Sequence, residues 1–412
     1  MKWFILTDPL AGGSLQVVGC TRGRVGMANG SPEAVPHYYR GVQLHKSGDL
    51  DGAMAEYRTA LQLNPDLIEA HMNLGVALAE KGDVEGAIAE YRTALRLNPN
   101  YVEAHDNLGA ALSEKGDVEG AIAEYRTALR LNPNYPEAHY NLAHDLMTKG
   151  DVEGAIAEYR TTLQLNPNHV DAHSNLGVAM AGNGDVDGAI AEYHTALRLD
   201  ANHASTHNNF GLILHWKGDF VSARKEFEEA LRLILDTPDN QRRIRTIRVN
   251  LSKLNADEVA FHNDRGSALA QKGDLAGAIG EYRTAVGLDP SHVVAHVNLG
   301  NALAQKGDLD GAIAEFQTAI GLNPDDVASH FSLGIALAKQ GDADGAIAEY
   351  RTTLQLNPNH VGAHVSLGLL FQILGNKNEA REELRQGITL LERVPGSQTR
   401  VEAIRNKLRE LE

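Results

Sequence analysis

Apolar and polar positions alternate with a helical spacing along most of the chain. Two short helices are indicated in one representative stretch, residues 67–100, because their apolar residues follow a helical spacing. The first is marked by Ile68, Leu74, Val76 and Leu78. The second is marked by Ala87, Ile88, Tyr91, Ala94 and Leu95.

The turns around these helices carry their own signals. Gly82 lacks a Cβ and can take the left-handed conformation that ends a helix. Asp83 is expected to cap the next helix, with Glu85 in its positive first turn. That helix is expected to end at residues 98–100, Asn-Pro-Asn, because proline cannot continue it. The pattern predicts a helical hairpin.

The hairpin signal recurs every 34 residues. Its Gly-Asp pair begins at Gly48, Gly82, Gly116, Gly150, Gly184 and Gly218, then at Gly273, Gly307 and Gly341, and ends as Gly375-Asn376. The step from Gly218 to Gly273 is 55 residues, one period plus 21. One such hairpin is too small to bury its own apolar face, so the units are expected to stack on their neighbours.

These repeated residues resemble the tetratricopeptide repeat family. The shared positions are a small residue in the first helix, an alanine and an aromatic residue in the second, and a turn proline, as in Gly75, Ala87, Tyr91 and Pro99. One departure is systematic, since all ten units carry histidine where the family often has tryptophan. The resemblance covers residues 34–233 and 258–391. It implies an all-α fold, a right-handed superhelical solenoid of about ten helical hairpins with two capping helices.

Two segments outside the period have matching apolar spacing. They are marked by Ile244, Ile247, Leu251 and Leu254, and by Val401, Ile404, Leu408 and Leu411. Each is expected to be a helix that covers the last repeat before it, as solenoids require. The predicted organisation is a leader (1–33, irregular or disordered), a six-repeat array (34–233), a linker with an internal capping helix (234–257), a four-repeat array (258–391) and a C-terminal capping helix (392–412).

The leader allows more than one interpretation. Residues 17–20, Val-Val-Gly-Cys, resemble a bacterial lipoprotein cleavage box, but Asp8-Pro9 interrupts the apolar region before it. A disordered leader and a true start at Met27 are the alternatives. No apolar run reaches the roughly 18 residues of a membrane span. We expect a cytoplasmic protein, with a lipid anchor at Cys20 as the alternative.

Charge and cysteine content exclude other classes. The 38 Lys and Arg residues against 54 Asp and Glu give a net charge of −16, which argues against nucleic-acid binding. The basic residues of 242–253 are expected to form the solvated face of the first capping helix. A single cysteine excludes an internal disulfide framework.

The ten histidines are not expected to bind metal. Equivalent residues of stacked helices lie about 8–10 Å apart, whereas zinc ligands lie about 2 Å from the ion. Each histidine is instead expected to be half-buried between the two helices of its unit. Residues 81–101 and 115–135 are identical, and such a repeated surface does not bring different groups together as catalysis needs. We therefore expect no enzyme activity, metal or cofactor.

A groove is the expected binding feature. In the family that the chain resembles, first helices line the concave side, and residues two before the small Gly or Ala face into it. Six asparagines hold this position and are the candidate peptide-binding residues: Asn73, Asn107, Asn141, Asn175, Asn209 and Asn298. Asparagine both donates and accepts hydrogen bonds. The row resembles the asparagine ladder in the repeat arm of O-linked N-acetylglucosamine transferases, whose catalytic domain has no counterpart here. The alternative is that these amides bond only within or between repeats.

The two arrays line this groove with different chemistry. The first carries Glu69, Glu103, Glu137 and Asp171, whereas the second has Ala260, Val294, Ala328 and Gly362 at the same positions. The first groove should favour polar or basic segments and the second apolar ones. The leading hypothesis is a non-enzymatic scaffold that binds a protein or an extended peptide. The alternative is a substrate-recognition or assembly subunit for a separately encoded glycosyltransferase or secretion enzyme.

Overall fold

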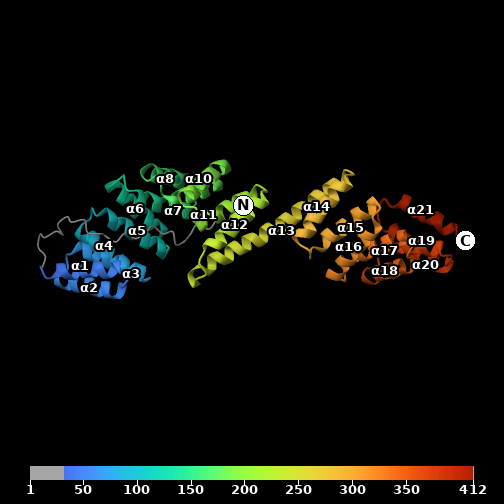
Figure 1. Cartoon of the computed structure of the whole chain (residues 1–412), viewed down its shortest axis with the longest axis horizontal. Coiled ribbons are helices and arrows are strands. Elements are labelled where there is room, and N and C mark those ends of the chain that lie inside the picture. Colours follow the sequence, from blue (N-terminus) through green and yellow to red (C-terminus); the bar gives the residue numbers. More distant parts are fainter. Residues whose placement is uncertain (1–31, 412) are drawn as a thin grey trace. The chain divides into compact units, whose positions relative to one another are not determined.

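A computed structural model describes residues 32–411, which are helical throughout and contain no strand (Figure 1). Six hairpins come first: α1 (Ala34–Lys46), α2 (Leu50–Leu63), α3 (Ile68–Glu80), α4 (Val84–Leu97), α5 (Val102–Lys115), α6 (Val118–Leu131), α7 (Pro136–Lys149), α8 (Val152–Leu165), α9 (Val170–Gly182), α10 (Val186–Leu199), α11 (Ala204–Trp216) and α12 (Phe220–Leu233).

After these hairpins come a short 3-10 turn and nine further helices of the described chain. They are η1 (Pro238–Asn240), α13 (Gln241–Gln271), α14 (Leu275–Leu288), α15 (Val293–Lys306), α16 (Leu309–Leu322), α17 (Val327–Gln340), α18 (Ala343–Leu356), α19 (Val361–Ile373), α20 (Lys377–Glu392) and α21 (Gln398–Arg409). The prediction of an all-α solenoid of helical hairpins is confirmed for the described residues.

The turn signals work as the sequence predicts. Gly82 has a φ of 82°, the left-handed conformation that ends α3. The Asp83 carboxylate then accepts a hydrogen bond from the Gly86 backbone N–H at 2.9 Å, which caps α4. The α4 helix ends at Leu97, directly before Asn98-Pro99. Because the same residues recur, the same hairpin is built again in each repeat.

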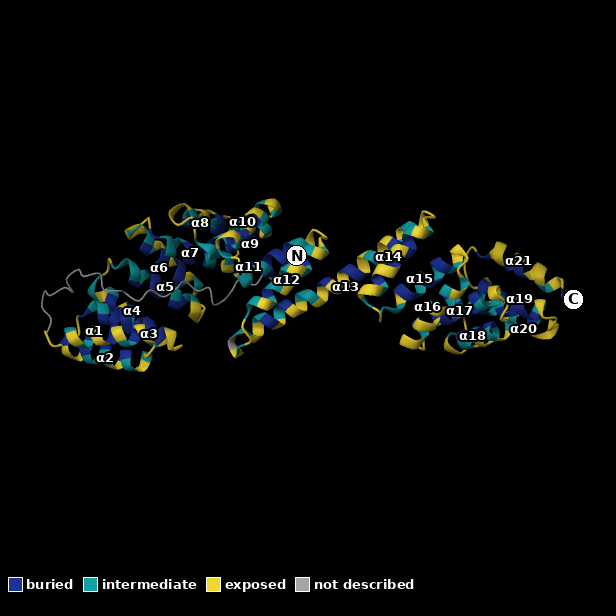
Figure 2. Ribbon diagram, in the orientation of Figure 1, coloured by how far each residue is buried: buried dark blue, intermediate teal, exposed yellow. Residues whose placement is uncertain are grey.

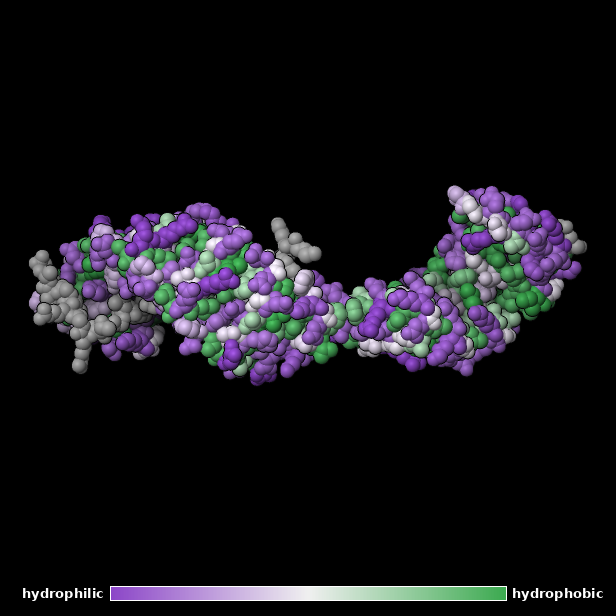
Figure 3. Space-filling model, turned by 90° about the horizontal axis from the view of Figure 1, so that it is seen from above, coloured by the Kyte–Doolittle hydropathy of each residue, from purple (hydrophilic) through white to green (hydrophobic). Residues whose placement is uncertain are grey.

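A close approach of ring and backbone holds most hairpins together. In the second hairpin, Tyr91 is fully buried, and a Cβ added to Gly75 would lie 2.5 Å from its Cε1 atom. The missing side chain at Gly75 therefore lets the ring of α4 lie directly against α3. Buried residues gather between the helices in this way throughout (Figure 2). The surface seen in Figure 3 is mostly hydrophilic, with apolar areas between.

The described residues form two compact units, divided between Asn250 and Leu251. The division falls inside α13, a single helix of 31 residues. The expected boundary at residues 257/258 is therefore not a helix end, and the insertion continues directly into the first helix of the seventh repeat. The reason is local, since residues 241–271 contain no proline and no Gly-Asp pair to stop the helix.

The start of α13 lies against the last hairpin of the first unit. Arg243 donates a hydrogen bond to the Ser205 hydroxyl at 2.6 Å. The side-chain amide of Asn250 donates to the side-chain carbonyl oxygen of Asn208 at 3.0 Å. Ile244 and Ile247 are buried in the same stretch. This is the position expected of a helix that covers a terminal repeat.

The leader lies almost entirely outside the described residues. Residues 32–33 form a turn before α1. The interpretations of residues 1–31, including lipidation at Cys20 and a start at Met27, are therefore outside the structure. Within the described part of the chain, no helix combines the length and the apolar character needed to cross a bilayer.

The C-terminal helix α21 covers the end of the second unit. Val401 and Ile404 are buried in one cluster with Leu384 and Leu391 of α20, and Leu408 packs against the edge of that cluster. We expect Leu408→Asp to weaken this packing by about 1–2 kcal/mol, because a charge would enter a half-apolar contact. Hydrogen exchange should then show faster exchange over residues 380–411.

A matched control for this change is Ala403→Asp, which places the same charge on the exposed side of α21. It should leave exchange in α20 at the wild-type rate. Equal exchange in both variants would show that α21 does not cover the repeat.

Candidate peptide-binding site

The first helix of each hairpin lies on the inner side of its unit. In the first unit α1, α3, α5, α7, α9 and α11 each contact the next member of that series, and in the second unit α15 contacts α17 and α17 contacts α19. Elements on the inside of a curved stack approach one another most closely, so these helices line the concave face. We refer to them as the inner helices.

The six candidate asparagines all lie on inner helices, but they are less accessible than the sequence suggests. The five in the first unit are between 0% and 9% exposed, whereas Asn298 on α15 is half-buried. A ligand therefore meets these amides only at their edges. Their role in peptide binding stays a prediction.

Most of these amides link one hairpin to the one before it. The Nδ2 atom of Asn73 donates to the Tyr38 hydroxyl at 3.3 Å, that of Asn141 to the Asp106 carboxylate at 3.1 Å, and that of Asn175 to the Tyr140 hydroxyl at 3.0 Å. In the second unit Asn298 donates to Asn263 at 2.9 Å. Each acceptor lies 35 residues earlier in the chain. The alternative in which the asparagines bond between repeats thus holds for these four.

Asn107 breaks this series for a simple reason. The residue 35 positions before it is Met72, whose side chain offers no comparable acceptor. The Asn107 Nδ2 atom is buried and has no hydrogen-bond partner among the described residues. The same asparagine position is therefore satisfied or unsatisfied according to the residue that the preceding hairpin supplies.

Carboxylates form a row at the start of the inner helices. Glu69, Glu103 and Glu137 are partly exposed and form no ion pair within the described chain. Asp171 continues the row and pairs with His203 at 3.1 Å. Burial raises the pKa of Tyr101, and the nearby charges of Glu103 and Glu69 raise it further. Two carboxylates of the row, those of Glu69 and Glu103, therefore lie close enough to the Tyr101 phenol to raise its pKa.

One further carboxyl of this face is buried. Asp106 on α5 is 4% exposed, and burial raises its pKa from 3.8 to about 7, although the hydrogen bond from Asn141 opposes the shift. Asp106 is thus largely protonated in mildly acidic solution and largely ionised in mildly alkaline solution. No sequence pattern singles out this aspartate, because its burial depends on the stacking of α5 and α7.

The repeated histidines lie between the two helices of their hairpins, as predicted, but their partners were not predicted. In all ten hairpins Nδ1 contacts a glutamate 19 residues later, at 2.5–2.6 Å: His37–Glu56, His71–Glu90, His105–Glu124, His139–Glu158, His173–Glu192, His207–Glu226, His262–Glu281, His296–Glu315, His330–Glu349 and His364–Glu383. The constant spacing of 19 residues in the sequence is the signal that could have revealed these pairs.

The second ring nitrogen favours the charged form of the pair in the third hairpin. The Nε2 atom of His105 lies 3.0 Å from the carbonyl oxygen of Pro99. A carboxylate and a carbonyl both only accept, so the ring satisfies both when each nitrogen carries a proton. The hydrogen bond to Glu124 raises the pKa of His105, against a smaller effect of burial. In eight of the ten hairpins the histidine makes this second contact and so joins the two helices of its hairpin to the preceding turn.

No metal site arises from these groups. Among residues 32–411, no three or more His, Cys, Asp or Glu side chains are placed so that they could hold one ion. Each repeated histidine instead faces the glutamate of its own hairpin. The expectation of a metal-free protein stays a prediction for the whole chain.

The inner face of the second unit is apolar and more open. Val297 on α15, Phe331 and Ile335 on α17, and Val365 and Leu369 on α19 are all half-buried. Phe331 contacts the His360 ring with a centroid separation of 4.5 Å. The residues at the start of these helices include Val294, which is 55% exposed. The predicted difference between an acidic and an apolar face is thus present in the two units.

Sequence profiles establish the family of this protein. The profile described as "Tetratricopeptide repeat" matches residues 140–204, 181–234, 245–293, 263–327, 297–361 and 331–396. The profile described as "TPR repeat" matches residues 41–82, 77–116 and 111–144. These matches span most of the chain, which belongs to the tetratricopeptide repeat family.

Several solved structures are similar to parts of the chain. The MamA protein is 27% identical over 42% of this chain and 93% of its own, with a TM-score of 0.37. A thermophilic TPR protein of Thermus thermophilus is 24% identical over 44% of this chain and 98% of its own, with a TM-score of 0.37. The TPR domain of P58(IPK) is 17% identical over 84% of this chain and 99% of its own, with a TM-score of 0.29. No curated protein sequence matches the chain.

Proposed function

We propose that this chain is a non-enzymatic scaffold that binds a protein or an extended peptide along its inner helices. The observation that carries the proposal is the row of Glu69, Glu103 and Glu137, which recur at the 34-residue period without an ion-pair partner among the described residues. Like charges in a row repel one another, and inside the chain these glutamates interact favourably only with the first turns of α3, α5 and α7. They are available to the positive groups of a partner.

The asparagines and the second unit extend this proposal. Asn107, Asn141, Asn175, Asn209 and Asn298 are proposed to contact the backbone of the bound segment at their exposed edges, and the fully buried Asn73 is proposed to do so only where its hydrogen bond to Tyr38 opens. The half-buried apolar residues of α17 and α19 are proposed to contact apolar side chains of the same partner or of a second one. The proposed compartment is the cytoplasm.

The test compares two triple variants of the full chain in affinity purification. Glu69, Glu103 and Glu137 are changed together to glutamine, which removes three negative charges from the inner helices. The matched control changes Glu85, Glu119 and Glu153, which recur at the same period on the outer helices α4, α6 and α8. Glu85 and Glu119 form exposed ion pairs with Lys115 and Lys149. Exposed pairs of this kind contribute little to stability.

We expect the inner variant to retain about tenfold less partner than the wild type, and the control to retain a normal amount. A partner that both variants retain equally would contradict the proposed groove. A glycosyltransferase or secretion enzyme among the partners would favour the recognition-subunit alternative. The chain alone should show no catalytic activity in that case too.

A further inference from the structure

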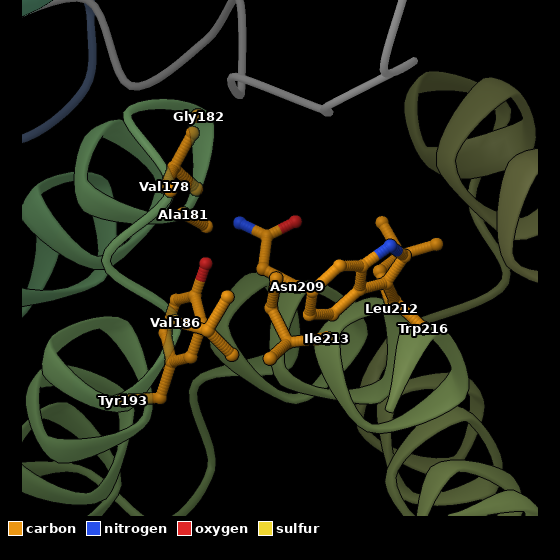
Figure 4. A pocket seen from close by; sticks show the side chains of 10 residues that line it. Val178, Ala181, Gly182, Val186, Tyr193, Asn209, Leu212, Ile213 and Trp216 are labelled. Atoms are coloured by element: carbon orange, nitrogen blue, oxygen red, sulfur yellow. The ribbon is translucent and has the colours of Figure 1, made fainter. Parts of the chain in front are cut away.

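An apolar pocket opens between the fifth and sixth hairpins of the first unit (Figure 4). Its volume is about 230 Å³. The walls are Val178 and Ala181 of α9, Tyr193 of α10, and Leu212, Ile213 and Trp216 of α11. An apolar cavity of about 150 Å³ is large enough to bind benzene, so this pocket has room for one large apolar side chain.

Two departures from the repeat create the pocket. At the end of α9 stands Gly182, where α3 and α5 have Glu80 and Glu114. A Cβ at Gly182 would meet no atom within 4 Å, so the space beside it is open. The equivalent residue of α11 is Trp216, which is 55% exposed and forms the opposite wall. Gly182 thus leaves the space open, and the indole of Trp216 gives that space an apolar wall.

The inner face of the hairpins that precede the pocket is acidic. The helices α3, α5, α7, α9 and α11 contain no arginine and only two lysines. Those two, Lys115 and Lys149, are each paired at 2.7 Å with a glutamate of an outer helix. No lysine or arginine of these helices therefore pairs with Glu69, Glu103 or Glu137. Such a surface is complementary to a basic segment.

The distance between the two features sets a spacing. The carboxylate row lies at the start of the inner helices and the pocket at their ends. Asp171 and Gly182 of α9 mark this separation, although Asp171 itself pairs with His203 and the nearest carboxylate of the row that is unpaired within the described chain is Glu137 of α7. Eleven helical residues span about 16 Å at about 1.5 Å per residue. An extended peptide covers that distance in about five residues at about 3.3 Å each.

We propose that the pocket binds one large apolar side chain of an extended basic peptide, with arginine or lysine about five residues away on the carboxylate row. The proposal rests on the proposed function and specifies the partner's chemistry. The apolar side chain anchors the peptide in the pocket between α9 and α11. The basic residues orient it across the inner face.

Trp216 gives a direct readout of this pocket. The chain contains two tryptophans, Trp3 and Trp216. The variant Trp3→Phe leaves Trp216 as the single tryptophan of the full chain. A side chain seated in the pocket covers the exposed indole and should shift its emission to shorter wavelengths.

The probes are synthetic peptides of about 12 residues that carry three arginines and one phenylalanine about five residues from the nearest arginine. Both sequence directions are made, each with a matched peptide in which alanine replaces the phenylalanine. We expect the phenylalanine peptide to bind Trp3→Phe protein at least about tenfold more tightly than its alanine counterpart. Only the phenylalanine peptide should shift the emission of Trp216.

A pocket-filling variant provides the second arm. Gly182→Leu places a side chain in the open space and should lower affinity for the phenylalanine peptide to that of the alanine peptide. Gly287→Leu is the matched control, because this glycine of α14 also has no atom within 4 Å of an added Cβ. It should bind both peptides as the parent protein does.

The possible failures are distinguishable. If both peptides bind equally, or if Gly182→Leu changes nothing, the pocket is not the anchor and this inference is wrong. The proposed function still stands in that case if the Glu69, Glu103 and Glu137 triple variant weakens both peptides. If neither peptide binds in either direction, the inference and the proposed acidic groove are both wrong.

Discussion

Replacing Tyr91 by alanine is expected to lower the free energy of unfolding of the first unit by about 3–5 kcal/mol. The ring is fully buried in the second hairpin and lies against the backbone of Gly75. Its removal leaves a cavity. The side chains of the neighbouring hairpins cannot fill this cavity, because they are already packed in the same way within their own hairpins. Because each hairpin is stabilised mainly by its neighbours, α3 and α4 should lose protection in hydrogen exchange before the rest of the unit.

The matched control is Tyr91→Phe. The Tyr91 hydroxyl has no hydrogen-bond partner among the described residues, and phenylalanine occupies the same position in other hairpins as Phe227 and Phe316. We expect this change to stabilise the unit by about 1 kcal/mol, since it removes a buried polar atom. Urea denaturation followed by circular dichroism measures both variants. Equal losses in both would mean that the hydroxyl, and not the ring, supports the packing.

Stability of the first unit is expected to fall as the pH rises from about 4 to about 7, and Asp106 should cause most of the change. Its pKa is 3.8 when unfolded and about 7 when folded, so the folded state binds the proton more tightly. Folding is therefore penalised progressively above pH 3.8, and the penalty is complete above about 7. A difference of roughly three pKa units corresponds to about 4 kcal/mol.

The histidine–glutamate pairs act in the same direction. The pKa of His173 is raised above 6.5 by its hydrogen bond to Glu192, against burial. The stabilising effect of its charged form is therefore complete below pH 6.5 and is lost as the pH rises through the raised pKa. The same reasoning applies to His105 and its partner Glu124.

The test is Asp106→Asn, which keeps an acceptor for Asn141 but cannot ionise. We expect it to stabilise the first unit by up to about 4 kcal/mol at pH 8 and to change little near pH 4. The histidine pairs should leave a smaller residual loss of stability at high pH. Glu103→Gln, on the same helix but partly exposed, is the control; it retains Asp106 and should keep a pH profile close to that of the wild type, changed only slightly because the charge of Glu103 contributes to the raised pKa of Asp106. An unchanged pH profile for Asp106→Asn would show that this carboxyl is not the source.

Local sequence signals were enough to predict the helices and their order. Gly82, Asp83 and Pro99 each act within a few residues of the chain, through a left-handed backbone, a capping hydrogen bond and a missing N–H. Such signals need no knowledge of the neighbouring hairpin. Where they are absent, as between Gln241 and Gln271, the helix continues, and the expected boundary inside that stretch does not coincide with a helix end.

The sequence by itself therefore determined a stack of ten hairpins with an acidic and an apolar inner face. Only the tertiary structure decided which side chains on those faces are free. Asn73 and Asn107 hold the same repeat position, yet Asn73 donates to the hydroxyl of Tyr38, whereas the residue 35 positions before Asn107 is Met72 and the Asn107 amide has no partner among the described residues. The pocket beside Gly182 depends in the same way on Trp216 of the next hairpin. Burial and partners arise from residues more than 30 positions apart, which the stacking of hairpins brings together and which no local pattern describes.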